Sequence, residues 1–383
     1  TGYGTHMREF IAAARKLGCE VLPVILGGAE KAGIVTGEGK AWGMKRLLRA
    51  ICPPYIWRSI KEFRLMKFDR HAEKTLEEAV EKFKPDLIYE RSAWLQDSGA
   101  LVAKKKNIRY CVEVNAPFPE EMREFENAGS WFEKVGKGKM RYQLSVADCL
   151  VVVSSALGNY LACEFKIDPS KIQVIPNAVD PQRFNVSPDD VNGFRAKYGL
   201  SNAKVLGFVG SIFPYHGVDK LIDAFATIAG EMKNLPLKLL IVGDGYLLPA
   251  LKEQAVALGI EKDVIFTGPL PPAEIPVALS AMHIGIMAKT NWYGSPVKIF
   301  EYGAAGLQII APDTISVRDV MVPGEDGLLV SGKQDELKNA IVHLLTHEAD
   351  GKRMANHFRE KVLNQFTWEK STMNTLKACG FRF

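Results

Sequence analysis

The 383-residue sequence lacks the features of a membrane-spanning, disulfide-stabilised or zinc-binding protein. No apolar run approaches the roughly 20 residues that a membrane-spanning helix needs. The first residues are polar and glycine-rich and do not form a hydrophobic leader. The six cysteines are scattered without a Cys-x-x-Cys pair. That spacing predicts reduced, mostly buried thiols in a cytoplasmic protein and no metal site.

Two nucleotide-binding fingerprints are also missing. No Gly-x-Gly-x-x-Gly follows a strand, which argues against a nicotinamide-dependent oxidoreductase, and no Walker A loop is present. Nothing resembles a nucleic-acid recognition module. The 47% hydrophobic and 24% charged content is that of an ordinary globular protein, and the length allows two domains with full cores.

The positive charge is unevenly distributed. Residues 1–200 carry 31 lysines and arginines against 25 acids, and residues 40–70 carry nine against two, interleaved with aromatic and aliphatic side chains. Such a basic amphipathic segment can lie on an anionic membrane surface, which predicts peripheral contact with the inner face of the membrane. The alternative is a helix whose apolar side packs on the first domain.

Apolar runs rich in β-branched residues alternate with helical patterns along the chain. This alternation predicts an α/β protein with two facing, Rossmann-like, doubly wound domains. The expected strands are residues 20–26, 86–90, 109–115, 149–153, 172–175, 204–210, 237–243, 263–267, 283–287, 307–311 and 327–330.

The expected domain limits follow from proline content and helix signals. We expect residues 1–190 to form a first domain and residues 191–365 a second domain, with an irregular, proline-containing linker over 176–203. Residues 366–383 form a last helix, N-capped by Thr367, that crosses back to the first domain. Residues 2–6 look like the loop after a first strand, so we expect about 15 to 20 preceding residues to be missing.

The most informative segment runs from Ser295 to Gly306. Its pattern predicts a tight turn, a helix beginning near Val297, the acid Glu301 one turn later, and then a strand. A helix N-terminus offers unpaired N–H groups and a positive dipole end to a phosphate, and a carboxylate one turn on can accept hydrogen bonds from a ribose diol. The segment therefore predicts a socket for a nucleoside diphosphate.

Other glycine-rich turns sit where an open α/β sheet binds ligands, beyond the carboxyl ends of its strands. Each turn alone is a weak signal, but as a set they predict one ligand-binding edge. The turns contain Gly2-Tyr3-Gly4-Thr5, Gly210-Ser211, His216-Gly217, Gly243-Asp244-Gly245 and Gly268-Pro269-Leu270.

Together with Val174 to Asp180 (Val-Ile-Pro-Asn-Ala-Val-Asp), these segments closely resemble glycosyltransferase family 4, in a subgroup carrying Ser-Pro-x-Lys-x-Phe-Glu-Tyr. The resemblance covers nearly the whole chain. It implies the two-domain GT-B fold and a retaining transfer of a sugar from a nucleotide donor, UDP- or GDP-linked, to an acceptor hydroxyl. It also implies no required metal or other cofactor, and it places the protein in glycan, exopolysaccharide or glycolipid biosynthesis.

The resemblance implies that residues 1–190 are the acceptor-side domain and residues 191–365 the nucleotide-sugar donor domain, and it assigns roles to matching positions. Glu301, Lys298 and His216 form the catalytic set, with Glu301 holding the donor ribose. The donor-binding positions are Gly210, Ser211, Gly217, Gly243, Gly268, Leu270, Asn291, Ser295 and Val297. The acceptor-side positions are Gly4, Thr5, Glu90, Arg91, Glu113 and Asn115.

Four positions depart from the family pattern. Tyr293 stands where many members have a first acid, and Asn115 stands in place of a histidine. Ser211 and His216 replace the usual arginine and lysine, so Lys298, Lys289 and a protonated His216 are expected to neutralise the departing diphosphate in part. Two other classes stay open: a non-catalytic nucleotide-sugar or carbohydrate-binding assembly protein, and a sugar-nucleotide epimerase of similar fold.

Overall fold

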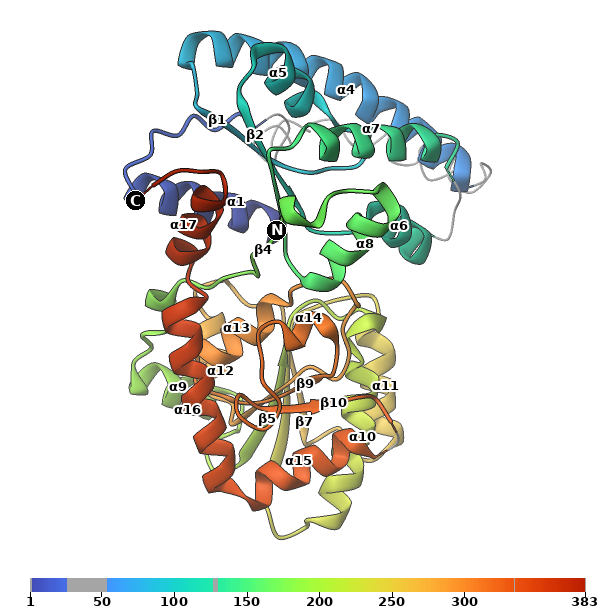
Figure 1. Cartoon of the computed structure of the whole chain (residues 1–383). Coiled ribbons are helices and arrows are strands. Elements are labelled where there is room, and N and C mark those ends of the chain that lie inside the picture. Colours follow the sequence, from blue (N-terminus) through green and yellow to red (C-terminus); the bar gives the residue numbers. More distant parts are fainter. Residues whose placement is uncertain (1, 26–53, 127–129, 334, 383) are drawn as a thin grey trace, which may run out of the picture. The chain divides into compact units, whose positions relative to one another are not determined.

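The computed structural model describes residues 2–25, 54–126, 130–333 and 335–382, which fall into two compact α/β units (Figure 1). Unit 1 comprises Thr1–Ile175 with Thr372–Phe383, and unit 2 comprises Pro176–Ser371. The expected α/β fold with parallel sheets is confirmed in both units.

Unit 1 is built on a parallel sheet in the order β1-β2-β3-β4. Its strands are β1 Leu87–Arg91, β2 Arg109–Val114, β3 Cys149–Val152 and β4 Ile172–Val174. Its helices are α1 Gly2–Lys16, α4 Pro54–Phe83, α5 Ser98–Lys106, α6 Phe118–Glu126, α7 Glu133–Val146 and α8 Ser155–Phe165. Ser154 caps α8 by accepting from the Leu157 N–H at 3.1 Å.

Strand β2, one of the two inner strands, is buried on both faces from Tyr110 to Val114, and this buried stretch includes the acid Glu113. Strand residues alternate between faces, so Tyr110 and Cys111 point to opposite sides of the sheet. The Tyr110 side carries α5 and α7. On the Cys111 side, Phe10 of α1 stacks on Tyr89 of β1 with ring centroids 4.1 Å apart.

Unit 2 is built on a six-stranded parallel sheet in the order β10-β9-β8-β5-β6-β7. Its strands are β5 Lys204–Val209, β6 Leu237–Val242, β7 Val264–Gly268, β8 Ile284–Ile286, β9 Gln308–Pro312 and β10 Leu328–Val330. Its helices are α9 Pro188–Lys197, α10 Val218–Glu231, α11 Leu248–Ala257, α12 Ile275–Ser280, α13 Val297–Ala304, α14 Ile315–Arg318, α15 Glu336–Thr346 and α16 Glu348–Gln365.

The period-two alternation of β5 separates two cores in unit 2. Val205 and Val209 pack with residues of α12, α13 and α16, whereas Leu206 and Phe208 pack with residues of α10, α11 and α15. Helices therefore cover both faces of the sheet, as in doubly wound folds. This arrangement leaves the carboxyl ends of the strands for the turns that carry the predicted site.

The structure corrects two expectations near the N-terminus. Residues 2–6 lie in helix α1 and not in a loop. No strand forms over residues 20–25, where Leu22 and Ile25 are 46% and 65% exposed, and residue 26 lies outside the described part. An apolar run becomes a strand only where a sheet edge pairs with it, and none of the described strands pairs with this one.

The segment 176–203 is also more regular than its prolines predict. It contains the 3₁₀ turn Pro181–Phe184 and helix α9, with Pro188 at the start of the helix, where a missing N–H costs nothing. The contact boundary lies at Ile175 and not at residue 190, and the segment belongs to unit 2.

The last helix, α17 (Trp368–Ala378), begins where the sequence predicts, with Thr367 Oγ1 accepting from the Lys370 N–H at 3.3 Å. Its residues from Thr372 onward belong to unit 1. In the described residues, no helix is long and apolar enough to cross a membrane. Residues 40–53 of the basic segment lie outside that description, and residues 54–70 form the first half of α4.

Candidate functional site

Helix α13 begins at the carboxyl end of the unit 2 sheet, after the segment that follows β8. Pro296 occupies the N-cap position and has no side-chain acceptor for the first helical N–H groups. The next residue, Val297, is 44% exposed, so this helix end is open to solvent. The N–H groups of Val297 and Lys298 are therefore placed to bind an anion at the positive end of the helix dipole.

Lys298 lies over the end of β5. The backbone of Gly210 has a φ of 142°, and a Cβ there would come within 2.4 Å of the Lys298 Cε. Only glycine therefore admits the lysine stem at this point. The ammonium lies 3.1 Å from His216 Nε2 and 5.4 Å from the centroid of the Phe208 ring. Burial lowers the pKa of Lys298 to about 8, while the Glu301 carboxylate favours the charged form.

His216 is buried at the end of a 3₁₀ turn, Pro214–His216. Its pKa is lowered to about 3, mainly by burial and in part by the charge of Lys298. The expected protonated His216 is therefore wrong: the imidazole is neutral near pH 7 and accepts a hydrogen bond from the lysine. Ser211, the other replaced position, is exposed.

Glu301 lies one turn into α13 and is half-buried. Burial raises the pKa of its carboxyl group, and the positive charges of Arg183 and Lys298 oppose that shift. Arg183 was missed by the sequence reasoning. It comes from the 3₁₀ turn Pro181–Phe184, and its Nη2 donates to the carbonyl of Pro272 at 3.1 Å. The Pro-Asn-x-Val-Asp motif just before it was the available signal.

The glycine turns after β5, β6 and β7 pack against each other. Gly243 has a φ of 133°, and a Cβ there would come 2.0 Å from the carbonyl oxygen of Gly210. Its N–H donates to the carbonyl of Gly268 at 3.0 Å. Gly217 precedes α10 directly, and Leu270 packs partly buried on the core beside α12 and α13. These predicted donor positions thus share one edge of one sheet.

Two predicted donor residues are engaged in shaping the loop before α13. Ser295 Oγ accepts from the N–H of Asn177 at 3.1 Å, and the Ser295 carbonyl accepts from Asn177 Nδ2 at 2.6 Å. Asn291 Oδ1 accepts from the N–H of Gly294 at 2.8 Å. The Pro-Asn-x-Val-Asp motif therefore positions this loop, and Asn177 is a second residue that the site prediction omitted.

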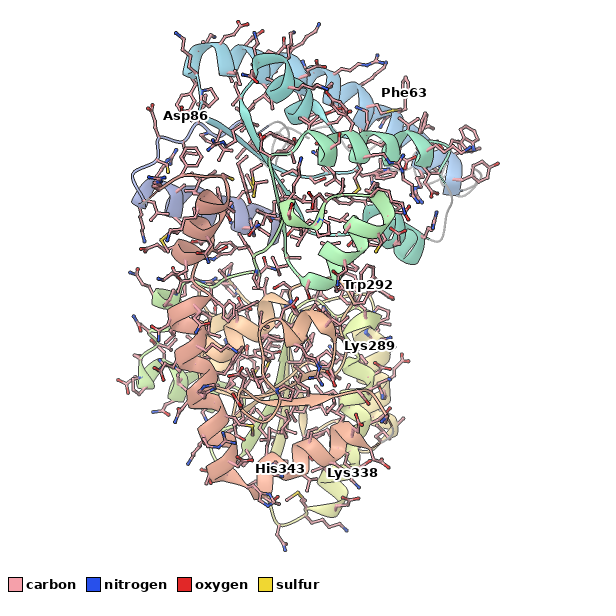
Figure 2. All side chains as sticks on the ribbon, viewed as in Figure 1. Phe63, Asp86, Lys289, Trp292, Lys338 and His343 are labelled. Carbon is pink, nitrogen blue, oxygen red and sulfur yellow. The ribbon has the colours of Figure 1, made fainter. Side chains whose placement is uncertain are left out.

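Tyr302 fixes α13 against the sheet. Its fully buried hydroxyl accepts from the N–H of Val209 at 3.1 Å, at the end of β5 and next to Gly210. Tyr293, the residue in the place of an acid, is 3% exposed and packs edge-on against Trp292. Lys289 and Trp292, both labelled in Figure 2, belong to the same segment between β8 and α13.

A second cluster of predicted residues surrounds Glu113 at the carboxyl end of β2 in unit 1. The Glu113 carboxylate accepts from the Tyr89 hydroxyl and, at 2.7 Å, from Asn115 Nδ2. His6 Nε2 of α1 lies 3.2 Å from Glu113 Oε1, and Arg91 Nε of β1 lies 3.6 Å from it. The structure thus brings Arg91, Glu113 and Asn115 together and adds His6.

The charges in this cluster depend on its burial. The pKa of Glu113 is raised to about 7, because burial outweighs the opposing effect of the hydrogen bond from Asn115. The pKa of His6 is lowered to about 3, mainly by burial and in part by the charge of Arg91. Near neutral pH, Glu113 is therefore the group in this cluster that can gain or lose a proton.

Glu90 does not belong to this cluster. It precedes Arg91 on β1 and points to the other face of the sheet, where it accepts from the Tyr110 hydroxyl. A Cβ on Gly99 of α5 would come 2.1 Å from Glu90 Oε2. Glu90 is therefore an acid of the unit 1 interior. Of the other acceptor-side predictions, Gly4 and Thr5 fall in the first turns of α1, just before His6.

Comparison with known proteins agrees with this architecture. A family model described as "Glycosyltransferase Family 4" matches residues 1–183, and one described as "Glycosyl transferases group 1" matches residues 203–347. The Anabaena protein HepE, solved with UDP, is 19% identical, with a TM-score of 0.67 over 81% of this chain and 82% of that chain. The fold is that of the two-domain GT-B glycosyltransferases.

Curated relatives at higher identity are also glycosyltransferases. A D-inositol 3-phosphate glycosyltransferase of Stackebrandtia nassauensis is 29% identical over 61% of this chain and 54% of its own length. A GDP-mannose-dependent mannosyltransferase of Mycolicibacterium smegmatis, acting on a phosphatidylinositol monomannoside, is 27% identical over 58% of this chain and 59% of its own length. The chain spans about half to two thirds of the length of the curated relatives that it matches.

Proposed function

We propose that this chain is a retaining glycosyltransferase. It moves a sugar from a UDP- or GDP-sugar to an acceptor hydroxyl in glycan, exopolysaccharide or glycolipid biosynthesis. The observation that carries the proposal is the start of α13, where an open helix N-terminus, Lys298 and Glu301 occur within five consecutive residues. HepE, which shares the fold, binds UDP, and the mycolicibacterial relative uses GDP-mannose, which supports the donor class and leaves the base open.

The negative charge on the departing diphosphate must be stabilised. The N–H groups of Val297 and Lys298 and the ammonium of Lys298 stabilise it, because all three are fixed in place before the donor binds. Glu301 accepts hydrogen bonds from the ribose diol and places the diphosphate at the helix end. His216 is neutral, and it holds Lys298 in place by accepting its hydrogen bond. The acid cluster around Glu113 belongs to the acceptor side, and no metal ion takes part in the transfer.

The proposal is tested by measuring nucleoside diphosphate release from a panel of sugar nucleotides with glycan and lipid-linked acceptors. We expect activity with one donor class, and Glu301→Ala to raise the donor KM roughly 10- to 100-fold, as lost charge-assisted hydrogen bonds do. Glu253→Ala, an exposed site on α11, is the matched control and should leave the donor KM unchanged. Unchanged donor kinetics in Glu301→Ala would remove this residue from the donor site.

The stereochemical part of the proposal has its own readout. The anomeric configuration of the product, measured by proton NMR, should match that of the sugar nucleotide. An inverted product would contradict the retaining mode and leave the transferase assignment standing.

A further inference from the structure

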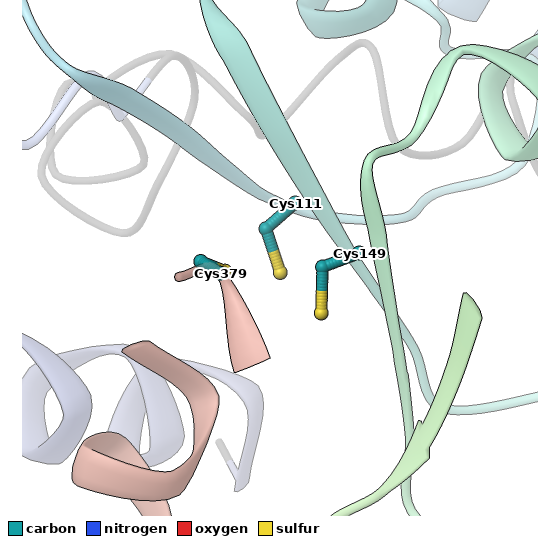
Figure 3. A group of neighbouring side chains, drawn as sticks. All are labelled: Cys111, Cys149 and Cys379. Atoms are coloured by element: carbon teal, nitrogen blue, oxygen red, sulfur yellow. The ribbon is translucent and has the colours of Figure 1, made fainter. Parts of the chain in front are cut away.

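Three cysteines that are far apart in the sequence converge in unit 1 (Figure 3). Cys111 lies on β2, Cys149 opens β3, and Cys379 follows the last residue of α17. Their sulfur atoms all lie within 4.8 Å of one another. The side chains are almost fully buried, with exposures of 0%, 2% and 4%. The sequence predicted scattered thiols because it carries no short Cys-x-x-Cys spacing.

The backbone of each cysteine is fixed by strand pairing or by hydrogen bonds. Cys111 and Cys149 are directly paired across the parallel strands β2 and β3. Cys379 is held at the end of α17, where its N–H donates to the Thr375 carbonyl at 3.0 Å and its carbonyl accepts from the Arg109 guanidinium. The Gly380 that follows has a φ of 84°, which ends the helix and lets the chain turn back.

We propose that Cys111, Cys149 and Cys379 bind one thiophilic divalent ion, of which Zn²⁺ is the representative. An ion with metal–sulfur distances of about 2.3 Å requires its sulfurs to be roughly 4 Å apart, so the three thiols need only a small contraction. Their neighbours are the apolar residues Leu87, Tyr89, Ile175, Ala378 and Phe381, which favour a soft sulfur-ligated ion over a hydrated hard one.

The charge balance favours a divalent ion. Three thiolates and one divalent cation carry a net charge of −1, and the guanidinium of Arg109 beside Cys379 supplies +1. A surface hollow of about 480 Å³, lined by Asp86, Asn107, Ile108, Arg109, Asp148 and Phe381, shares Arg109 and Phe381 with the surroundings of the cluster. The hollow brings solvent to Arg109 and Phe381, and no residue of the predicted transferase site lines it.

The bound ion would act as a cross-link within unit 1. It ties the C-terminal residues to the two middle strands of the unit 1 sheet, because Cys379 is separated from Cys111 and Cys149 by all of unit 2 in the sequence. Arg109, Cys111 and Glu113 alternate along β2 and so share one face of the sheet. The cross-link therefore also restrains the strand β2, which carries Glu113.

The test is ion titration of the full chain after chelation under reducing conditions. Co²⁺ is the spectroscopic probe, and Zn²⁺ should displace it. We expect one equivalent to bind with a sulfur-to-cobalt charge-transfer band, and the ion to raise the melting temperature because it binds the folded state. A wild-type chain that takes up no stoichiometric ion would overturn the proposal, whatever the variants do.

The matched pair of variants is Cys379→Ser and Cys163→Ser, the latter changing an exposed cysteine on α8. Losing a ligand should weaken ion binding by roughly 100-fold or more, since even residues behind the ligands are worth 10- to 100-fold. Cys163→Ser should bind as wild type does. Equal affinity in wild type and Cys379→Ser would contradict the assignment, provided that circular dichroism shows the variant folded.

A thiol count separates the ion site from a disulfide. The protein is purified without reductant, denatured and treated with a chelator. All six cysteines should then react as free thiols. Four free thiols would indicate a disulfide and overturn the proposal. None of these outcomes depends on nucleotide binding, so the ion site and the proposed transferase function succeed or fail separately.

Discussion

At the scale of single residues, Lys298 is the group whose charge state matters most near neutral pH. In the proposed function it replaces, in part, the arginine and lysine that the family resemblance expects at the positions of Ser211 and His216. Its pKa of about 8 follows from burial under Gly210 and beside neutral His216. Because its folded-state pKa is lowered, the ammonium is present below pH 8 and is lost as the pH rises through that value.

This gives a pH prediction for the donor step. In wild type, kcat/KM for the donor should fall as the pH rises past about 8, because that parameter reports the free enzyme. Lys298→Met should lower kcat/KM roughly 10- to 100-fold at pH 7 and abolish this fall. Lys298→Arg keeps the charge at all accessible pH values, so it should also flatten the profile. A wild-type fall that persists in Lys298→Met would assign it to another group.

Glu90 supports a stability prediction. Burial raises its pKa to about 7, whereas its usual value is 4.5. Between these values the unfolded chain releases the proton and the folded chain keeps it, so the free energy of unfolding falls as the pH rises. Glu90→Gln cannot ionise, so this variant lacks the loss of unfolding free energy that Glu90 causes as the pH rises. Its stability relative to wild type should therefore increase by about 1–3 kcal/mol from pH 4.5 to 7.

Denaturant unfolding at several pH values measures this difference. Glu253→Gln, at an exposed position on α11, is the control and should show a difference that does not change with pH. Transfer activity in Glu90→Gln should stay near wild type, because Glu90 faces away from the Glu113 cluster. A difference for Glu90→Gln that is flat with pH would contradict the buried-acid account.

At the scale of elements, the start of α13 depends on two hydrogen-bonded anchors. Tyr302 joins the helix to the end of β5, and Asn177 holds the preceding loop through Ser295. The loop carries Asn291 and Gly294 and has no regular structure of its own, so its position depends on these contacts. The donor socket is therefore a property of several elements.

Asn177→Ala should loosen that loop. It removes the amide that donates to the Ser295 carbonyl, at a cost of about 1–3 kcal/mol in unfolding free energy. We expect the donor KM to rise several-fold while the product anomer is unchanged. Asn202→Ala, at an exposed turn before β5, is the control. If Asn177→Ala has wild-type donor KM and wild-type stability, this residue does not position the socket.

The sequence predicts elements well where a pattern is local. The strands of unit 2 and the start of α13 follow from continuous apolar runs and from the Ser-Pro turn, and both are confirmed. Residues 20–25 show the limit, because an apolar run there finds no paired sheet edge. Helix α9 shows the opposite error, because its proline predicts irregular structure but occupies the first turn of a helix.

The site is less predictable from sequence, because side chains from distant segments meet only in the fold. The charge of Arg183, which lowers the pKa of Glu301, and the contact of His6 with Glu113 are interactions of this kind. So is the cysteine cluster, whose members are too far apart to form a motif. Adjacent residues can also separate, as Glu90 and Arg91 do across the two faces of β1.

At the scale of the whole molecule, the two units carry different parts of the proposed chemistry. Unit 2 holds the predicted donor half-site, and unit 1 holds the Glu113 cluster and the cysteines. The GT-B fold and the two family models that match separate parts of the chain agree with this division. Peripheral membrane contact through residues 40–70 remains a prediction.

The central claim is that Glu301 and the start of α13 bind a nucleoside diphosphate, and calorimetry tests it most directly. Titrating wild type with UDP and with GDP should show one binding site for at least one of them. Glu301→Ala should weaken that binding at least tenfold, which corresponds to about 1.4 kcal/mol. The absence of binding by either nucleotide, or equal affinity in wild type and Glu301→Ala, would contradict the account.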